Sequence, residues 1–216
     1  MTYGQLPKVI DNISVNCKEM MFYQHLPIKL SGQYYFKIED RLRCFNPIIH
    51  AAVNDFLQKW EYDKHFLSNI YLTVKRQYQS HDKLFNRPGY HSDGFMTGDI
   101  NYVWSDTNPT VFNTSAFNLT MDDELSLREM EEQALSENEV MFPNNTLLRL
   151  DQYVIHKVNQ DYAFSGMRTF VKISFSEDRY DLEGNAHNYL LDYNWEMKPR
   201  QNKRNIPQTT ISAFGG

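Results

Sequence analysis

The chain has 216 residues, of which 41% are hydrophobic and 23% charged, so it can form a globular core, and its length fits a single domain over residues 1–216. Its formal net charge of −5 disfavours a protein whose main task is to grip the phosphate backbone of nucleic acids. The sequence shows neither a basic and apolar leader nor an apolar run of membrane-spanning length, so we expect a cytoplasmic protein with no membrane partner.

Residues 1–69 are expected to supply elements that support the core. Gly32–Ile38 is the best strand candidate there, because it is rich in aromatic residues. Asn46 and Pro47 then mark the start of a helix, with Asn as the cap and Pro at the first helical position. Apolar residues follow at four-residue spacing from Ile48 to Trp60, which predicts an amphipathic helix of about 14 residues.

The middle of the chain is expected to be mostly strands. Ile70–Tyr78, Ile100–Trp104, Leu147–Lys157 and Arg168–Ser176 are rich in β-branched and aromatic residues, which are typical of strands. Strands this short and this numerous do not suit a doubly wound parallel sheet. The fold class is therefore mainly β (α+β), mostly antiparallel, and the C-terminal residues 195–216 are expected to form a polar surface arm.

One helix is predicted among these strands, in the acidic segment 122–135. Thr120 is its expected cap, because an acid follows at the position that a capping box requires. Leu127, Met130 and Ala134 share one face, and the other faces are strongly acidic. We expect this helix to face solvent rather than to belong to the core.

The tripeptide from His91 to Asp93 carries the chemical argument. In a strand, residues i and i+2 point to the same side, so the imidazole and the carboxylate can converge on one ion. Gly94 follows directly and lets the backbone turn away. Two histidines and one carboxylate on one face of a metal, with the opposite positions open, are the ligand set of non-haem iron(II) oxygenases.

The third ligand has to come from a distant part of the chain. His156 is the best candidate, since it lies in the predicted strand Leu147–Lys157, and Arg168 follows it after a turn at Ser165–Gly166 that would fold the next strand back beside it. A planar guanidinium at that position can bind a carboxylate through two parallel hydrogen bonds.

Other interpretations of these residues stay open at this point. His156 can be a buried histidine that is hydrogen-bonded to a carbonyl group, and Arg168 can pair with Asp161 or Glu177 on the surface. His187 is the main rival to His156 as a ligand, although no suitably placed arginine follows it.

The ordered set of His91, Asp93, His156 and Arg168 resembles the superfamily of 2-oxoglutarate- and iron(II)-dependent oxygenases, over about residues 70–176. The resemblance implies a double-stranded β-helix (jelly-roll) core with supporting helices. It implies that the two histidines and Asp93 bind iron(II), and that Arg168 holds the distal carboxylate of the co-substrate 2-oxoglutarate.

Further residues are candidates for contacts with 2-oxoglutarate. Lys172 shares the face of Arg168 on the same predicted strand, and several members of the superfamily carry a second polar residue there. On the upstream strand the candidates are Lys75, Gln77 and Tyr78, of which Tyr78 is included in the predicted site. The acidic segment 122–135 would be an insertion near the entrance of the site.

The resemblance implies an enzyme that uses dioxygen and 2-oxoglutarate, releases succinate, and hydroxylates a second substrate. Demethylation and desaturation use the same chemistry, whereas the carboxylate of Asp93 argues against halogenation. A catalytically inactive jelly-roll binding module is the alternative. The sequence leaves the substrate open between a small molecule, a protein side chain and a nucleobase.

Overall fold

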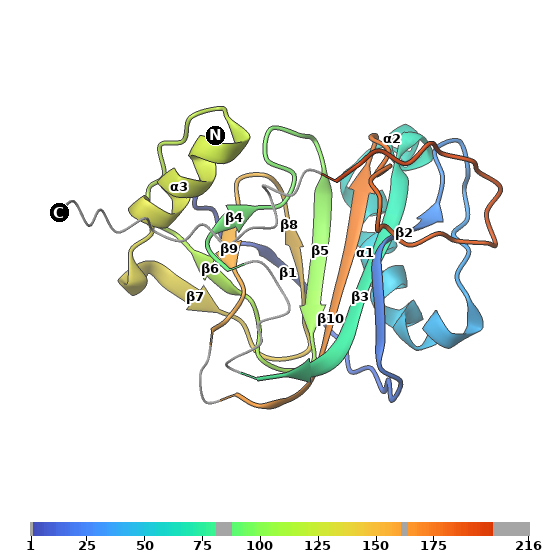
Figure 1. Ribbon diagram of the computed structural model, residues 1–216, viewed down its shortest axis with the longest axis horizontal. Helices are drawn as coiled ribbons and strands as arrows, with labels where there is room; N and C mark the ends of the chain where they lie inside the picture. The colour runs from blue at the N-terminus through green and yellow to red at the C-terminus, as the bar shows by residue number, and fades with distance from the viewer. Residues whose placement is uncertain (1, 81–87, 161–163, 201–216) are drawn as a thin grey trace.

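The computed structural model describes residues 2–80, 88–160 and 164–200, and its described part is mainly β (Figure 1). Two antiparallel sheets account for the strands. A six-stranded sheet has the order β1-β8-β5-β10-β3-β2, and a four-stranded sheet has the order β4-β9-β6-β7.

The strands are β1 (Lys8–Asn12), β2 (Met21–Lys29), β3 (Asn69–Gln79), β4 (His91–Ser92), β5 (Ile100–Ser105), β6 (Val111–Asn113), β7 (Glu139–Met141), β8 (Thr146–Leu150), β9 (Ile155–Lys157) and β10 (Gly166–Ser176). The α-helices are α1 (Asn46–Lys59), α2 (Tyr62–Leu67) and α3 (Asp123–Gln133), and short 3-10 helices are η1 (Asp40–Phe45) and η2 (Ser136–Asn138).

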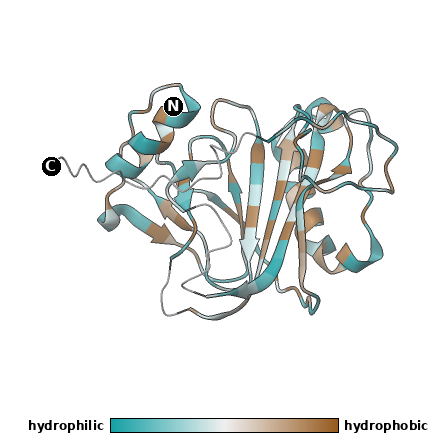
Figure 2. Ribbon diagram, in the orientation of Figure 1, coloured by the Kyte–Doolittle hydropathy of each residue, from teal (hydrophilic) through white to brown (hydrophobic). Residues whose placement is uncertain are grey.

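The centre of the six-stranded sheet is the long pair β3 and β10. The two strands pair without interruption from Gly166 opposite Gln79 to Ser176 opposite Asn69. One face of this sheet packs against α1, where the ring of Phe56 stacks on Phe175 with 4.1 Å between centroids and 8° between planes. Apolar bands therefore run across these strands in Figure 2, and the largest cluster of buried apolar residues lies between the sheet and the helix.

The opposite face of the six-stranded sheet contributes to a second core. Val103 of β5 and Leu148 of β8 cluster there with Phe112 of β6, which belongs to the four-stranded sheet, and Phe170 of β10 packs against them. Because side chains alternate along a strand, Arg168 and Lys172 lie on this same inner face of β10. The sheet therefore directs two cations toward the four-stranded sheet.

The helix expected after Asn46 is confirmed as α1, with Pro47 at its start, but Asn46 does not cap it. Asn46 itself has helical backbone angles, and Phe45 occupies the cap position without a side-chain hydrogen bond. The strand expected over Gly32–Ile38 is wrong. Gly32 has a left-handed φ of +82° there, so the chain turns immediately after β2 instead of extending.

Leu147–Lys157 is not one strand, as the sequence suggested, but two strands in different sheets. Asp151 breaks it, since its side chain accepts a hydrogen bond from the Tyr153 amide at 3.0 Å and its carbonyl accepts one from Val154 at 3.2 Å. Such an Asx turn redirects the chain from β8 to β9. The expectation that the strand of Arg168 lies beside His156 is also wrong, because β10 pairs with β3 and β5.

The acidic helix is present as α3, but its cap and its environment differ from the expectation. Asp122, not Thr120, caps it, accepting hydrogen bonds from the amides of Glu124 and Leu125. Met130 is fully buried and packs in a cluster with Tyr90. The helix therefore packs on the four-stranded sheet through Met130, while its other faces, which carry acidic residues and the exposed Leu125, are left to solvent.

Among the described residues, no helix combines the length and the apolar character needed to cross a bilayer. Of the surface arm expected over 195–216, residues 201–216 lie outside the described part, as does most of the loop before His91, residues 81–87.

Candidate metal centre

Two short strands bring His91 and His156 together. β4 and β9 are antiparallel, and the two histidines are directly opposite each other in the pairing. The centroids of their rings lie 4.5 Å apart. Residues directly opposite each other in an antiparallel pair have neighbouring side chains on the same face. The register of β4 against β9 therefore places the two imidazole rings side by side.

The backbone sets the tautomer of both rings. His91 Nδ1 lies 3.2 Å from the carbonyl oxygen of Gly89, and His156 Nδ1 lies 3.2 Å from that of Val154. A carbonyl oxygen can only accept, so in each neutral ring Nδ1 carries the proton and Nε2 keeps its lone pair. Histidines that bind metals usually donate their second ring N–H in this way.

Asp93 completes a group of three possible ligands. It is the first residue after β4, and one ligand atom from each of His91, Asp93 and His156 lies within 4.8 Å of the others. Gly94 has a φ of +73°, and a Cβ atom there would lie 2.8 Å from Thr97 Oγ1. Glycine therefore permits the sharp turn that keeps the Asp93 carboxylate beside the histidines.

The charges of the group suit a divalent cation. Burial, together with the neighbouring His156, lowers the pKa of His91 to about 4, so this imidazole is neutral at pH 7. Burial opposes the ionisation of Asp93, but Lys172 and His156 outweigh it and hold the pKa of Asp93 well below its usual range. Metals bind neutral histidine and ionised carboxylate, so His91 and Asp93 fit such an ion without a change of protonation.

A cavity of about 170 Å³ adjoins these ligands. The four-stranded sheet contributes the metal group, and the six-stranded sheet contributes mostly cations and polar groups. Besides His91, Asp93 and His156 it is lined by Gln24, His25, Thr73, Lys75, Val103, Thr110, Lys157, Val158, Arg168, Phe170 and Lys172.

Arg168 is buried in the wall of this cavity, with 7% of its surface exposed. Its Nε–H donates to the carbonyl oxygens of Asn108 at 2.9 Å and Thr107 at 3.2 Å, which fixes the plane of the guanidinium. Burial lowers its pKa to about 10, against an opposing effect of Asp106, so it stays charged at neutral pH. Arg168 is therefore not at the surface, as an ion pair with Asp161 or Glu177 there would require, and Asp161 itself lies outside the described residues.

Two lysines line the cavity near Arg168. Lys172 Nζ lies 3.0 Å from Asp93 Oδ1. Lys75 on β3 is paired with Phe170 across the sheet, and burial, with Lys172 and Arg168 nearby, lowers its pKa to about 8. Cations that gather in a buried cavity, and that lower the pKa of Lys75, favour an anionic ligand.

Tyr78 is not among the residues that line the cavity. About half of its surface is exposed, and its hydroxyl lies 3.1 Å from Ser165 Oγ. Gln77 is not a lining residue either. Of the three upstream candidates, the structure therefore brings Lys75 to the cavity. His187, the rival ligand, lies elsewhere and stacks on Tyr193.

His25 is a cavity residue that the sequence analysis missed. The pairing of β2 with β3 shifts between Tyr23 and Leu26, and His25 within this bulge has a left-handed φ of +48°. Its Nδ1 is buried and has no hydrogen-bond partner among the described residues. Bulges often redirect side chains next to active sites. Pro27 in the same strand was the available signal, because proline in a strand often marks an edge or a bulge.

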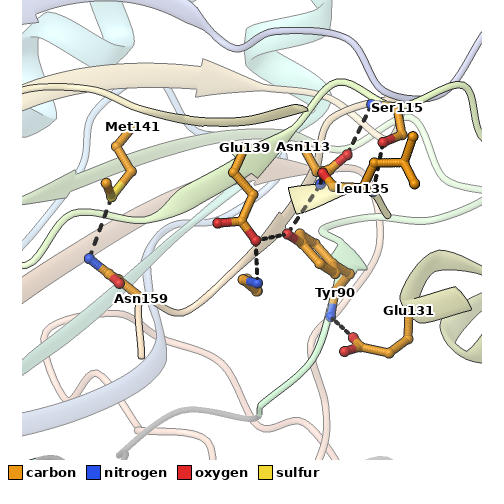
Figure 3. A network of polar contacts seen from close by, with 9 residues as sticks. Tyr90, Asn113, Ser115, Glu131, Leu135, Glu139, Met141 and Asn159 are labelled. Carbon is orange, nitrogen blue, oxygen red and sulfur yellow. Dashed lines mark hydrogen bonds and ion pairs between the residues drawn. The ribbon is translucent and has the colours of Figure 1, made fainter. Parts of the chain in front are cut away.

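A polar network around Tyr90 joins α3 to β6 and β7 (Figure 3). The Tyr90 amide donates to Glu131 of α3 at 3.0 Å, and its hydroxyl donates to Glu139 of β7 at 2.6 Å. Asn113 of β6 donates to the same hydroxyl at 3.2 Å. Because Tyr90 directly precedes His91, the network holds the backbone in place immediately before this candidate ligand.

Comparisons of the chain with protein-family models, with curated proteins and with solved structures returned no match. The functional assignment therefore rests on the geometry of the site.

Proposed function

We propose that this protein is a 2-oxoglutarate- and iron(II)-dependent oxygenase that hydroxylates a second substrate. The observation that carries the proposal is the pair of histidines on β4 and β9 whose Nδ1 atoms are held by backbone carbonyls. Asp93 Oδ2 lies 3.6 Å from His156 Nε2, and one ligand atom from each of the three residues lies within 4.8 Å of the others. Two histidines and one carboxylate around an open cavity are the ligand set of this class of iron site.

The strand arrangement supports a double-stranded β-helix for β3–β10, as we propose for the core. Apart from β6 and β7, an antiparallel pair within the four-stranded sheet, consecutive strands from β3 onward alternate between the six-stranded and the four-stranded sheet. Alternation between two antiparallel sheets is what winding a pair of strands into a jelly roll produces. In this fold β1, β2 and the helices would be additions around an eight-stranded core.

The cationic wall of the cavity supports 2-oxoglutarate as the co-substrate. This compound carries two carboxylates, and Arg168 on β10 offers a guanidinium whose plane is already fixed by Thr107 and Asn108. A fixed planar guanidinium can bind a carboxylate at low entropic cost. Arg168 would therefore anchor the distal carboxylate, while Lys75 and Lys172 add positive charge between Arg168 and the metal group.

Bound iron(II) would supply the activation of dioxygen that couples the oxidative decarboxylation of 2-oxoglutarate, to succinate and carbon dioxide, with hydroxylation of the substrate. The residues of the chain have separate tasks in this scheme. His91, Asp93 and His156 would hold the ion on one side, and Arg168 would orient the co-substrate. The substrate class stays open between a small molecule, a protein side chain and a nucleobase.

Anaerobic addition of iron(II) and 2-oxoglutarate tests the proposal. We expect a visible metal-to-ligand charge-transfer band, and formation of succinate when oxygen is admitted. His91→Ala should remove both signals while the circular dichroism spectrum stays unchanged. His187→Ala is the matched control, because this exposed histidine lies away from the cavity.

The outcomes separate the alternatives. Absence of the band in the unaltered protein would reject the iron site. Binding of metal and 2-oxoglutarate without any succinate in the presence of oxygen would favour an inactive jelly-roll binding module.

A further inference from the structure

The two carboxylate oxygens of Asp93 have different neighbours. Oδ1 accepts a hydrogen bond from Lys172 Nζ at 3.0 Å, and Oδ2 lies 3.6 Å from His156 Nε2. Both side chains of the ion pair are largely buried, with 15% of Lys172 and 19% of Asp93 exposed. The ammonium of Lys172 and the ring of His156 therefore approach the carboxylate at separate oxygens.

The position of Lys172 is fixed by the sheet. It lies in the middle of β10, paired with Thr73 of β3 on one side and with Val103 of β5 on the other. A residue between two neighbouring strands has little freedom to shift its backbone. Its ammonium is therefore held over Oδ1 from the sheet opposite the one that carries the metal group.

This arrangement affects how many coordination positions of a bound metal ion stay free for other ligands. A carboxylate can bind a metal through one oxygen or through both. Three protein ligands leave three of six octahedral positions free, whereas a second oxygen from Asp93 would take a fourth position. Lys172 occupies Oδ1 with a strong charge-assisted hydrogen bond, and its positive charge repels a cation that approaches the same oxygen.

We propose that Lys172 is a positioning residue that restricts Asp93 to one metal-binding oxygen, Oδ2, and so keeps a coordination position open at the cost of metal affinity. This inference rests on the proposed metal centre and deepens it. It predicts that the lysine weakens metal binding in exchange for space for the co-substrate and dioxygen.

Manganese(II) alone is a suitable probe, because its electron paramagnetic resonance signal reports binding and the relaxation of water protons reports how many waters the bound ion holds. The unaltered protein should hold Mn²⁺ with about three waters, the number that three protein ligands leave in an octahedral site. In Lys172→Met we expect affinity to increase at least tenfold and the water number to fall by about a third.

Two further variants separate charge from hydrogen bonding. Lys172→Arg keeps both, so it should restore the affinity and the water number of the unaltered protein. Lys172→Gln keeps a donor but no charge, so affinity should increase while three waters remain. Lys75→Met is the matched control, since it removes a positive charge from the same cavity without removing the partner of Asp93, and it should change the affinity less than threefold.

The failure of this inference differs from the failure of the proposed site. If the unaltered protein and His91→Ala bind Mn²⁺ equally, or neither binds it, the metal centre itself is wrong. If the unaltered protein binds Mn²⁺ through His91 but Lys172→Met shows an equal or lower affinity and the same number of waters, the role of Lys172 is wrong and the metal centre stands. Circular dichroism checks folding, and Lys172→Gln decides the charge effect if the methionine variant does not fold.

Discussion

Lys29 is expected to make the folded protein more stable as the pH rises above about 8. It is fully buried at the end of β2, and its ammonium donates to the carbonyl oxygens of Ser68 at 2.6 Å, Leu30 at 3.2 Å and Phe66 at 3.3 Å. No carboxylate among the described residues forms an ion pair with it. Burial therefore lowers the pKa of Lys29 to about 8.

The sign of the effect follows from proton binding. An unfolded lysine holds its proton up to a pH of about 10.4, so between pH 8 and that value the unfolded chain binds more protons than the folded chain, and stability rises with pH. The gap between the two pKa values means that burial of the charged Lys29 destabilises the folded state by about 3.3 kcal/mol at low pH. About 2 kcal/mol of this is recovered between about pH 7 and 9.5 by the same linkage relation.

Lys29→Met removes the titrating group and keeps the length of the side chain. From pH 7 to 9.5, the free energy of unfolding of the unaltered protein should rise by about 2 kcal/mol more than that of the variant. Urea denaturation at several pH values in this range measures the difference. Lys75 also has a pKa of about 8, but it titrates in both proteins and cancels. Parallel pH profiles for the two proteins would refute the reasoning.

Three further substitutions have expected effects on stability. Arg149→Met leaves the buried carboxylate of Asp55 without its guanidinium partner and should cost about 3 kcal/mol in urea denaturation. Gly94→Ala should cost more than the roughly 1–2 kcal/mol of a left-handed backbone, because the new Cβ would lie 2.8 Å from Thr97 Oγ1, and it should also weaken Mn²⁺ binding by displacing Asp93. Asp122→Ala removes the cap of α3 and should cost about 1 kcal/mol.

Matched variants isolate each cause. Arg43→Met breaks an exposed ion pair with Asp40 and should change stability by less than about 0.5 kcal/mol. Gly32→Ala adds a Cβ at a φ of +82° with no atom within 4 Å, so it reports the backbone strain alone. Asp122→Asn keeps an acceptor at the cap and should stay close to the unaltered protein. Equal losses in a variant and its control would contradict the stated cause.

Local patterns predicted the elements that single segments determine. Ile70–Tyr78 was expected as a strand and is β3 with one more residue at each end, because Ile70 to Val74 are apolar or β-branched and are buried on both faces of the sheet. The helix that starts at Asn46 has 14 residues, the length that the sequence predicted. Gly32–Ile38 was misjudged because aromatic content outweighed the glycine turn that ends β2.

The candidate metal ligands could be picked out because their pattern is short and ordered, and a pairing of His91 with His156 requires only that two strands meet. The other residues of the cavity were harder to predict from the sequence. The Asx turn at Asp151 sends β9 with His156 into the four-stranded sheet, so Arg168 on β10 reaches the cavity from the opposite sheet. His25 reaches it through a bulge in a distant strand. Sequence spacing does not encode which sheet a strand joins.

The unequal size of the two sheets has a consequence for the order in which the molecule loses structure. β4 has two residues and pairs with β9, whereas β10 pairs along its length with β3 and in part with β5. Segments with few backbone hydrogen bonds open locally at a free energy far below that of global unfolding. Opening of β4 would separate His91 from His156 and leave the large sheet intact, so amide exchange at His91 should be fast in the metal-free protein and slow once an ion joins the two strands.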